Sequence, residues 1–286
     1  MKDWQCTIAC SGGLMMNHEA NTDRVSSYCE LPAPVALQEY VLCLWTQSIL
    51  GASGVHAHRV LPDGCIDIVF INHDAPIVVG PWTDSFTARF LPGTTVLGAR
   101  FHPGRATGVL GLPASTLLNQ SVPLRDIWST TAHAQFARVP DEPTLPARLR
   151  ALEAALHGRL VDEAPLDAEV RAAIDWLARH PNGRVQQLSR WLGLSHRHLQ
   201  RRFSAAVGYG PKTFQSVLRF QRLLHLASSA REQQSLAHLA AAAGYADQAH
   251  MTREVGRYAG SPPARLLPSV ASTLRMSDLF KTGAGL

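Results

Sequence analysis

The sequence predicts an α+β protein in which a β-rich N-terminal domain precedes an all-α domain. Short apolar runs separated by turn residues fill much of the first half of the chain. A helical motif occurs twice within residues 185–268. Charge is also divided: residues 1–170 hold 11 basic and 17 acidic side chains, whereas residues 171–286 hold 16 and 5. The two parts therefore carry net charges of −6 and +11, which indicates two domains with different surfaces.

The first domain shows the sequence pattern of short strands. Apolar runs alternate with Gly and Pro turn residues, as at Cys65–Ile71, Ile77–Val79, Phe86–Leu91 and Thr95–Phe101. Such spacing predicts a β-sandwich or a barrel. Helical spacing is expected at Ala106–Leu118, Val122–Trp128 and Leu145–Leu160, whereas Val35–Leu50 fits a helix and a strand equally well.

The repeated motif has the organisation of a helix-turn-helix. Apolar residues recur at i, i+3 and i+4 in its first helix: Leu188, Trp191 and Leu192. Gly193 permits the left-handed backbone of a tight turn, and Ser195 is a good N-cap for the second helix. Leu199 and Phe203 form the apolar side of that helix. Its remaining face carries polar side chains: His196, Arg197, Gln200 and Arg201.

The second copy lies 51 residues later at Gly244 and 52 residues later from Met251 onward. Asp247 takes the N-cap position of its second helix, and Met251 and Val255 take the buried positions. The exposed polar positions of this copy are Gln248, Thr252 and Arg253. Arginine suits guanine, glutamine suits adenine and the threonine methyl suits thymine, so both faces can read base edges.

A single helix is predicted between the two copies, from Pro211 to about Ser229. Pro211 occupies the favourable first position of this helix. Apolar residues then recur at helical spacing: Phe214, Val217, Leu218, Leu224 and Leu226. Residues 211 to 229 would span roughly 28 Å at a rise of 1.5 Å per residue. Helices that enter successive major grooves lie about 34 Å apart. A linker of this length suits a DNA-binding domain with two recognition helices.

Residues 170–268 resemble the C-terminal DNA-binding domain of the AraC/XylS family of bacterial transcription regulators. The resemblance is most specific at Gly244–Arg253 and at Gly260–Pro263. The second copy departs from the family pattern, because Val255 stands where an aromatic residue is usual and Gly256 where a basic residue is common. The resemblance implies seven helices with two recognition helices. It implies base contacts at Arg197, Gln200, Arg201, Gln248, Thr252 and Arg253.

The first domain carries a second resemblance. Leu61–Phe70 and Leu97–Gly104 are similar to the N-terminal domain of a subset of AraC-like regulators. This similarity implies a cupin-like sensor or dimerisation module, but it names no ligand. The expected partner is double-stranded DNA. A small-molecule effector, a homodimer and contact with RNA polymerase stay open.

The composition limits the location of the protein. Five cysteines at irregular spacing fit neither a disulfide framework nor a zinc signature, so we expect a reducing cytoplasm. The segment that begins with Lys2 and Asp3 lacks the apolar stretch of a signal peptide. The sequence also contains no run of 18 apolar residues, the length that would span a membrane. Met15 and Met16 offer alternative starts of translation.

Two groups of residues in the first domain could bind a metal ion or a small molecule. His56 and His58, with Cys65, Asp67 or His102, could bind a metal ion, although such histidines more often simply face outward from a strand. A second group could line an effector pocket or form an ion pair that supports the Pro62–Gly64 turn: Asp63, Asp67, Arg100 and Arg105. The ion pair is the commoner arrangement. We assign no catalytic residue, metal ligand or cofactor.

We therefore expect an irregular extension at 1–27, a sensor or dimerisation domain at 28–165, a DNA-binding domain at 166–268 and a tail at 269–286. The sequence favours a transcription regulator that is not an enzyme. Two alternatives stay open: a metal-binding cupin-like enzyme with an accessory helical domain, and a helical module that binds proteins.

Overall fold

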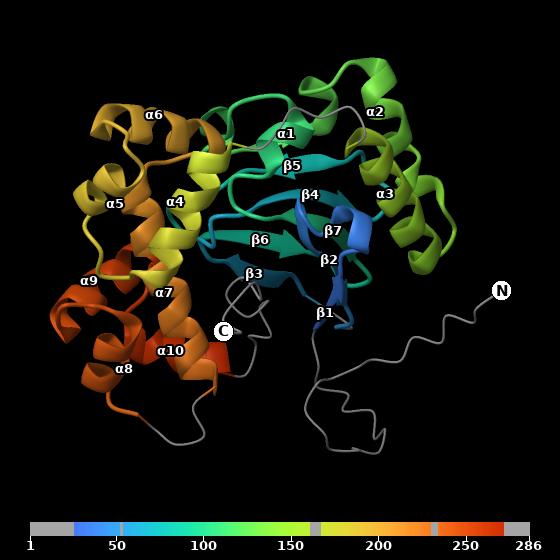
Figure 1. Cartoon of the computed structure of the whole chain (residues 1–286). Coiled ribbons are helices and arrows are strands. Elements are labelled where there is room, and N and C mark those ends of the chain that lie inside the picture. Colours follow the sequence, from blue (N-terminus) through green and yellow to red (C-terminus); the bar gives the residue numbers. More distant parts are fainter. Residues whose placement is uncertain (1–25, 52–53, 161–166, 230–233, 272–286) are drawn as a thin grey trace.

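The computed structural model describes residues 26–51, 54–160, 167–229 and 234–271 (Figure 1). The expected domain boundary near residue 165 and nearly all of the N-terminal extension and C-terminal tail lie outside these ranges, as do Met15 and Met16. The chain folds into a sheet domain, residues 26–160, and a helical domain, residues 167–271. Figure 1 shows the helical domain on one side of the sheets.

The sheet domain contains one sheet of six antiparallel strands in the order β1-β2-β7-β4-β5-β8 and a second sheet formed by β3 and β6. The strands are β1 (Ser26–Pro32), β2 (Val41–Ile49), β3 (His56–Val60), β4 (Ile66–Ile71), β5 (Ile77–Val79), β6 (Phe86–Phe90), β7 (Thr95–Phe101) and β8 (Ser121–Pro123). The β-rich architecture predicted from the short apolar runs is confirmed.

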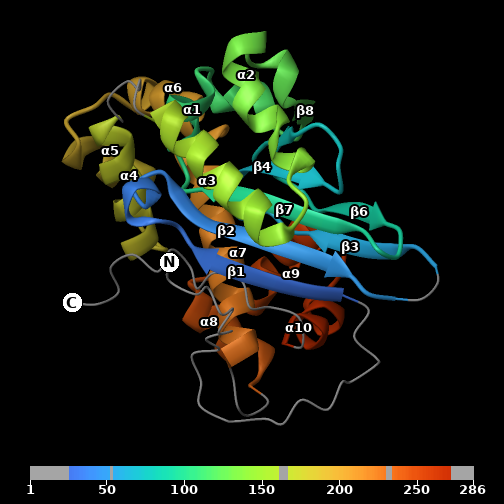
Figure 2. The same cartoon turned by 90° about the vertical axis from the view of Figure 1, so that its right-hand side faces the viewer.

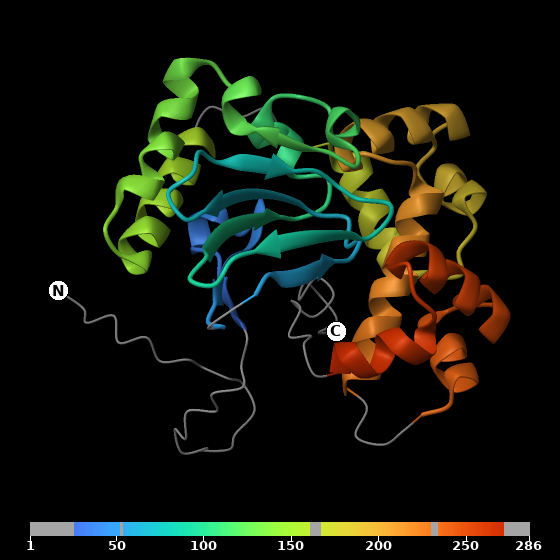
Figure 3. The same ribbon diagram turned by 180° about the vertical axis from the view of Figure 1, so that it is seen from behind.

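Side chains alternate across the large sheet, so each face has its own core. Ile68 and Phe70 point into the larger core, which is closed by α1 (Ala106–Leu110) and α3 (Leu145–Leu160). Trp45 and Val69 lie in a smaller cluster on the opposite face, which Phe90 of β6 helps to cover. Figures 2 and 3 show the two faces, with α3 over one and the β3–β6 pair over the other.

Three local predictions for the sheet domain need correction. The predicted helix at 106–118 is interrupted, because Gly111 adopts a left-handed backbone and only a short 3-10 turn, Ala114–Leu117, follows. Val122 does not begin a helix but lies in β8, where it pairs with Val78 of β5. The sequence pattern also missed α2 (Thr130–Ala137). The ambiguous segment from Val35 holds a 3-10 turn (Val35–Leu37) and then strand β2.

Two of the residues that could line an effector pocket, Asp67 and Arg100, form an ion pair instead. Arg100 of β7 lies opposite Asp67 of β4 and donates two hydrogen bonds to its carboxylate, at 3.1 and 3.0 Å. Arg100 also lies 3.6 Å from Asp63, which accepts a hydrogen bond from the Cys65 amide in the turn. Arg105 does not join this cluster and instead pairs with Glu39.

The two histidines that could bind a metal ion lie on one strand. His56 and His58 both belong to β3, with ring centroids 6.4 Å apart. His58 contacts the side chain of Gln47 at 3.4 Å. Within the described ranges, no three His, Cys, Asp or Glu side chains gather in an arrangement that could hold a metal ion.

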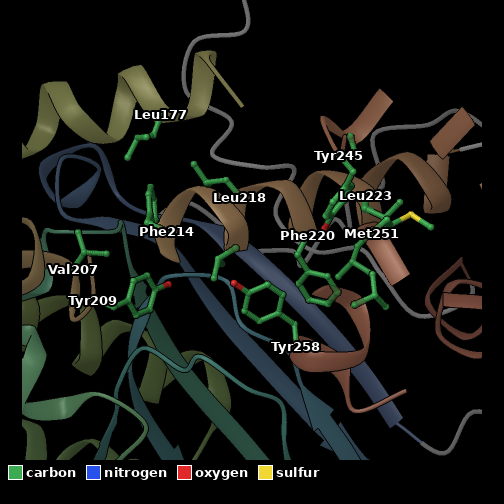
Figure 4. Packing of buried hydrophobic residues seen from close by; sticks show 14 of the residues in the cluster. Leu177, Val207, Tyr209, Phe214, Leu218, Phe220, Leu223, Tyr245, Met251 and Tyr258 are labelled. Carbon is green, nitrogen blue, oxygen red and sulfur yellow. The ribbon is translucent and has the colours of Figure 1, made fainter. Parts of the chain in front are cut away.

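The helical domain consists of seven helices: α4 (Ala168–Arg179), α5 (Val185–Trp191), α6 (His196–Val207), α7 (Pro211–Ser229), α8 (Leu236–Ala243), α9 (Gln248–Ala259) and α10 (Pro263–Ala271). Helix α7 is the predicted linker, and it begins and ends where the sequence pattern placed it. Figure 4 shows that its apolar side chains, such as Phe214 and Phe220, meet side chains from the surrounding helices, such as Tyr258 of α9.

Helix α7 also contacts the sheet domain. Buried Gln221 donates a hydrogen bond to the carbonyl oxygen of Pro62. Gly64, in the same turn as Pro62, lies so close to α7 that a Cβ at this position would come within 2.8 Å of the Phe214 ring. Only glycine fits at this position, where the backbone is also left-handed (φ +84°).

Two further contacts join the sheet domain to the parts of the helical domain that flank α7. A Cβ on Gly208, just before α7, would come within 2.4 Å of Pro81. Arg59 of β3 donates hydrogen bonds to the Ser261 hydroxyl at 3.1 Å and to the Ala259 carbonyl oxygen at 3.4 Å. The sheet domain therefore touches both halves of the helical domain.

We predict that Arg100→Met destabilises the protein by about 3–5 kcal/mol, because Asp67 would stay buried without its partner. Urea-induced unfolding measures the change as a lower midpoint. The double variant Arg100→Met, Asp67→Leu should recover much of the loss. Arg89→Met is a matched control, because Arg89 is exposed on β6, and it should change the stability by less than about 0.5 kcal/mol. Equal losses in the two arginine variants would contradict this account.

Candidate nucleic-acid interface

The first helix-turn-helix unit, α5 to α6, is built by local interactions. Gly193 makes the turn with a left-handed backbone (φ +66°). The Ser195 side chain then accepts a hydrogen bond from the His198 amide at 3.2 Å and caps α6. Leu199 and Phe203 anchor the buried side of α6. The predicted cap and turn of this unit and the buried positions of α6 are confirmed.

The second unit, α8 to α9, repeats these features. Gly244 makes the turn (φ +90°), and Asp247 caps α9 by accepting a hydrogen bond from the His250 amide at 2.7 Å. Met251 and Val255 are fully buried, as the alignment of the two copies requires. Each second helix also ends at a left-handed glycine, Gly208 or Gly260, and a proline opens the helix that follows.

All seven side chains that the sequence assigns to DNA binding are exposed: His196, Arg197, Gln200, Arg201, Gln248, Thr252 and Arg253. They lie on α6 and α9, the second helices of the two units, and Figure 1 shows both helices on the side of the molecule away from the sheets. Arg197 and Arg201 are one helical turn apart and line one hollow. Within the described ranges, no acidic side chain pairs with Arg197, Arg201 or Arg253, so their charges are available to an external anion.

Other arginines of the helical domain have structural partners. Arg202 of α6 points away from the polar face and binds Asp167 at 2.7 and 2.8 Å and Glu169 at 2.6 Å. Asp167 also caps α4 by accepting from the Val170 amide. Although burial acts to raise it, the hydrogen bonds from Arg202 and from this amide hold the pKa of Asp167 below its usual range. These contacts fix α6 against α4.

Arg219 of α7 joins the two units. Its side chain is almost completely buried and donates to the Pro181 carbonyl oxygen at 3.3 Å, in the loop before α5. It also binds the Glu254 carboxylate of α9 at 3.2 and 3.3 Å. Gln215, one turn earlier, donates to the Gly183 carbonyl oxygen at 2.7 Å. The loop that leads into unit one, the linker helix and α9 of unit two therefore meet at one guanidinium.

Two family models match this chain. One, described as a helix-turn-helix domain, matches residues 188–268 and so covers both units. The other, described as a domain of unknown function (DUF6597), matches residues 30–123 of the sheet domain. The first match places the duplicated helical units of this chain in the helix-turn-helix class. The chain is a DNA-binding transcription regulator whose helix-turn-helix units resemble those of the AraC/XylS family.

Some solved structures are similar to this regulator. An apo ToxT variant from Vibrio cholerae strain SCE256 has 10% sequence identity and a TM-score of 0.43, over 80% of this chain and 97% of that chain. ToxT from Vibrio cholerae O395 has 9% identity and a TM-score of 0.40, over 77% of this chain and 98% of that chain. At such low scores these structures carry no argument, and the assignment as a DNA-binding regulator depends on the helix-turn-helix model and on the geometry of the two units.

Two further findings concern curated proteins and membrane-spanning helices. A search of curated proteins finds no match to the regulator. No helix in the described ranges is both long and apolar enough to cross a membrane.

The sequence pattern placed one residue of the interface wrongly and missed several others. Trp191 was expected on the apolar side of α5, but it is 57% exposed. A backbone or packing role was expected for Arg219, but the partners of Gln215, Arg219 and Glu254 were not foreseen, because they lie more than 30 residues away along the chain. The spacing of Glu254 from the α9 cap gives no local signal of this contact.

We predict that Arg219→Met destabilises the regulator by about 2–3 kcal/mol, because it leaves the largely buried Glu254 without its main cation. Urea-induced unfolding measures this change. Arg253→Met is a matched control on α9, and it should change the stability by less than about 0.5 kcal/mol because Arg253 is exposed. A stability loss at Arg219 no larger than the loss at Arg253 would contradict the role of Arg219 as the joint between the units.

Proposed function

We propose that the regulator reads two successive major grooves of one DNA duplex, with α6 and α9 as its recognition helices. The observation that carries this proposal is the pair of capped, exposed helices that present arginine, glutamine and threonine side chains. In unit one, His196, Arg197, Gln200 and Arg201 would contact base edges. In unit two, Gln248, Thr252 and Arg253 would do so.

The linker helix supports a two-groove arrangement. Helix α7 has 19 residues and so measures roughly 28 Å along its axis. Successive major grooves on one face of the duplex lie about 34 Å apart. The contacts of Arg219 and Gln215 hold both units against this helix, so both recognition helices can engage the duplex with little ordering on binding.

We further propose the domain roles that the sequence indicated: residues 28–165 as a sensor or dimerisation domain and residues 166–268 as the DNA-binding domain. A small-molecule effector would bind between the two sheets. This proposal is supported by the buried indole nitrogen of Trp45, for which the described residues offer no hydrogen-bond partner. Gln47 and His58 bring further polar atoms between the sheets. Burial, together with His56 and Arg100, lowers the pKa of His58, which favours a neutral imidazole there.

As a transcription regulator, the protein would work in the bacterial cytoplasm, where the chromosomal DNA lies. A homodimer through the sheet domain and contact with RNA polymerase belong to the same proposal. Analytical ultracentrifugation of the purified protein, with and without operator DNA, tests the dimer.

Selection of bound duplexes from a random pool tests the two-groove arrangement. We predict two subsites whose centres lie about one helical turn, 10–10.5 base pairs, apart. Recovery of a single short subsite would contradict the role of α9.

Base reading by unit one is tested with the selected operator. Arg197→Ala and Arg201→Ala should each weaken operator binding by about 1–3 kcal/mol, because each would lose a contact to a base edge. Gel-shift titrations on operator and on random duplex measure the loss. Binding to random duplex should change less. Arg265→Ala, an exposed arginine of α10, is the matched control and should leave the preference for operator unchanged. Equal losses on the two duplexes would refute base reading by these arginines.

A further inference from the structure

A basic cleft of about 340 Å³ lies between the two helix-turn-helix units. The loop before α5 and the turn between α8 and α9 form two of its sides, and α7 contributes Lys212, Gln215 and Arg219. The residues around it include three cations, Arg184, Lys212 and Arg219, and no aspartate or glutamate. The cleft is therefore a concave site with a positive lining.

Two of these cations have no acidic partner. Arg184 and Lys212 are both exposed, and neither forms an ion pair within the described part of the chain. Among the described residues, the Lys212 ammonium donates one hydrogen bond, to the amide oxygen of Gln215 at 3.4 Å. The nearby carboxylate of Glu254 is already engaged by Arg219 and by His250, whose ring nitrogen lies 3.5 Å away. Arg184 and Lys212 are thus available to bind an external anion.

Two residues that line the cleft hold buried polar atoms. Tyr245 is 5% exposed, and its hydroxyl has no hydrogen-bond partner among the described residues. The Nε atom of Arg219, which is 4% exposed, lacks a partner as well. Both atoms are enclosed by protein, so the donors that the cleft offers to a ligand are those of Arg184 and Lys212 at its rim.

The position of the cleft identifies the anion. If α6 and α9 enter successive major grooves, the minor groove and its two flanking backbones lie opposite the middle of the domain. The cleft occupies that middle, between the loop before α5 and the start of α9. We propose that it binds a backbone phosphate of the DNA segment between the two major grooves, through Arg184 and Lys212 at its rim. This inference rests on the proposed two-groove function.

Salt dependence of DNA binding tests the cleft. Each phosphate contact contributes about 0.9 to the slope of log K against log salt concentration. Lys212→Ala and Arg184→Ala should each lower this slope by about one and weaken operator and random duplex by the same factor, because phosphate contacts carry no sequence information. Both side chains are exposed, so the melting temperature of each variant should equal that of the wild type.

Two controls accompany these variants. Lys212→Arg keeps the charge and should keep the slope. Arg125→Ala also removes one cation, but from a 68% exposed side chain of the sheet domain, and it should leave the slope unchanged.

Duplexes with single neutral methylphosphonate linkages locate the contact. One linkage between the two subsites should weaken wild-type binding, and on that duplex Lys212→Ala should cause no further loss.

The outcomes separate the cleft from the proposed function. An unchanged salt slope in Lys212→Ala and Arg184→Ala, or a loss confined to operator, would overturn the phosphate site. If the wild-type protein shows no preference for any selected operator, the proposed function fails instead. A preference that survives in both cleft variants, together with reduced slopes, supports both.

Discussion

The relative position of the two recognition helices depends on one buried guanidinium. Arg219 binds the loop before α5, the linker helix that carries it and the carboxylate of Glu254 on α9. Removing a charge from water is costly unless its partners are held in place, so this arrangement requires all three segments together. The contacts that hold the two helix-turn-helix units together therefore form during folding, before the protein meets DNA.

The arginines of the regulator have two different roles, which differ in whether the guanidinium has a carboxylate partner. Arg202 and Arg219 have acidic partners and hold helices together. Arg197, Arg201 and Arg253 have no acidic partner within the described residues, and they face solvent on α6 and α9. Most of the described basic side chains after position 170 are likewise exposed, where a DNA backbone can use them.

Helix α7 is shared by both domains. Between Pro211 and Ser228, only Lys212 and Arg222 are exposed, because the two units cover one side of the helix and the sheet domain contacts the other. A helix buried on nearly all sides transmits displacement to each of its neighbours. The Pro62–Gly64 turn contacts α7 at Gln221 and Phe214, so the sheet domain and the two helix-turn-helix units share this helix.

The sequence by itself determined the parts of this regulator that depend on neighbours along the chain. The caps Ser195 and Asp247, the turns at Gly193 and Gly244 and the extent of α7 were predictable, because capping, left-handed backbone and helical periodicity act within a few residues. The exposure of the recognition faces followed from the same periodicity.

Only the tertiary structure decided which side chains meet across the fold. Trp191 fits the apolar spacing of α5, yet its side chain is 57% exposed. Val122 became part of a strand because β5 lies beside it. Glu254 pairs with Arg219, which lies 35 residues earlier in the chain. Arg184 and Lys212 line the same cleft. Such contacts bring together distant segments of the chain, and no local pattern encodes them, because their energy exists only once the helices have packed.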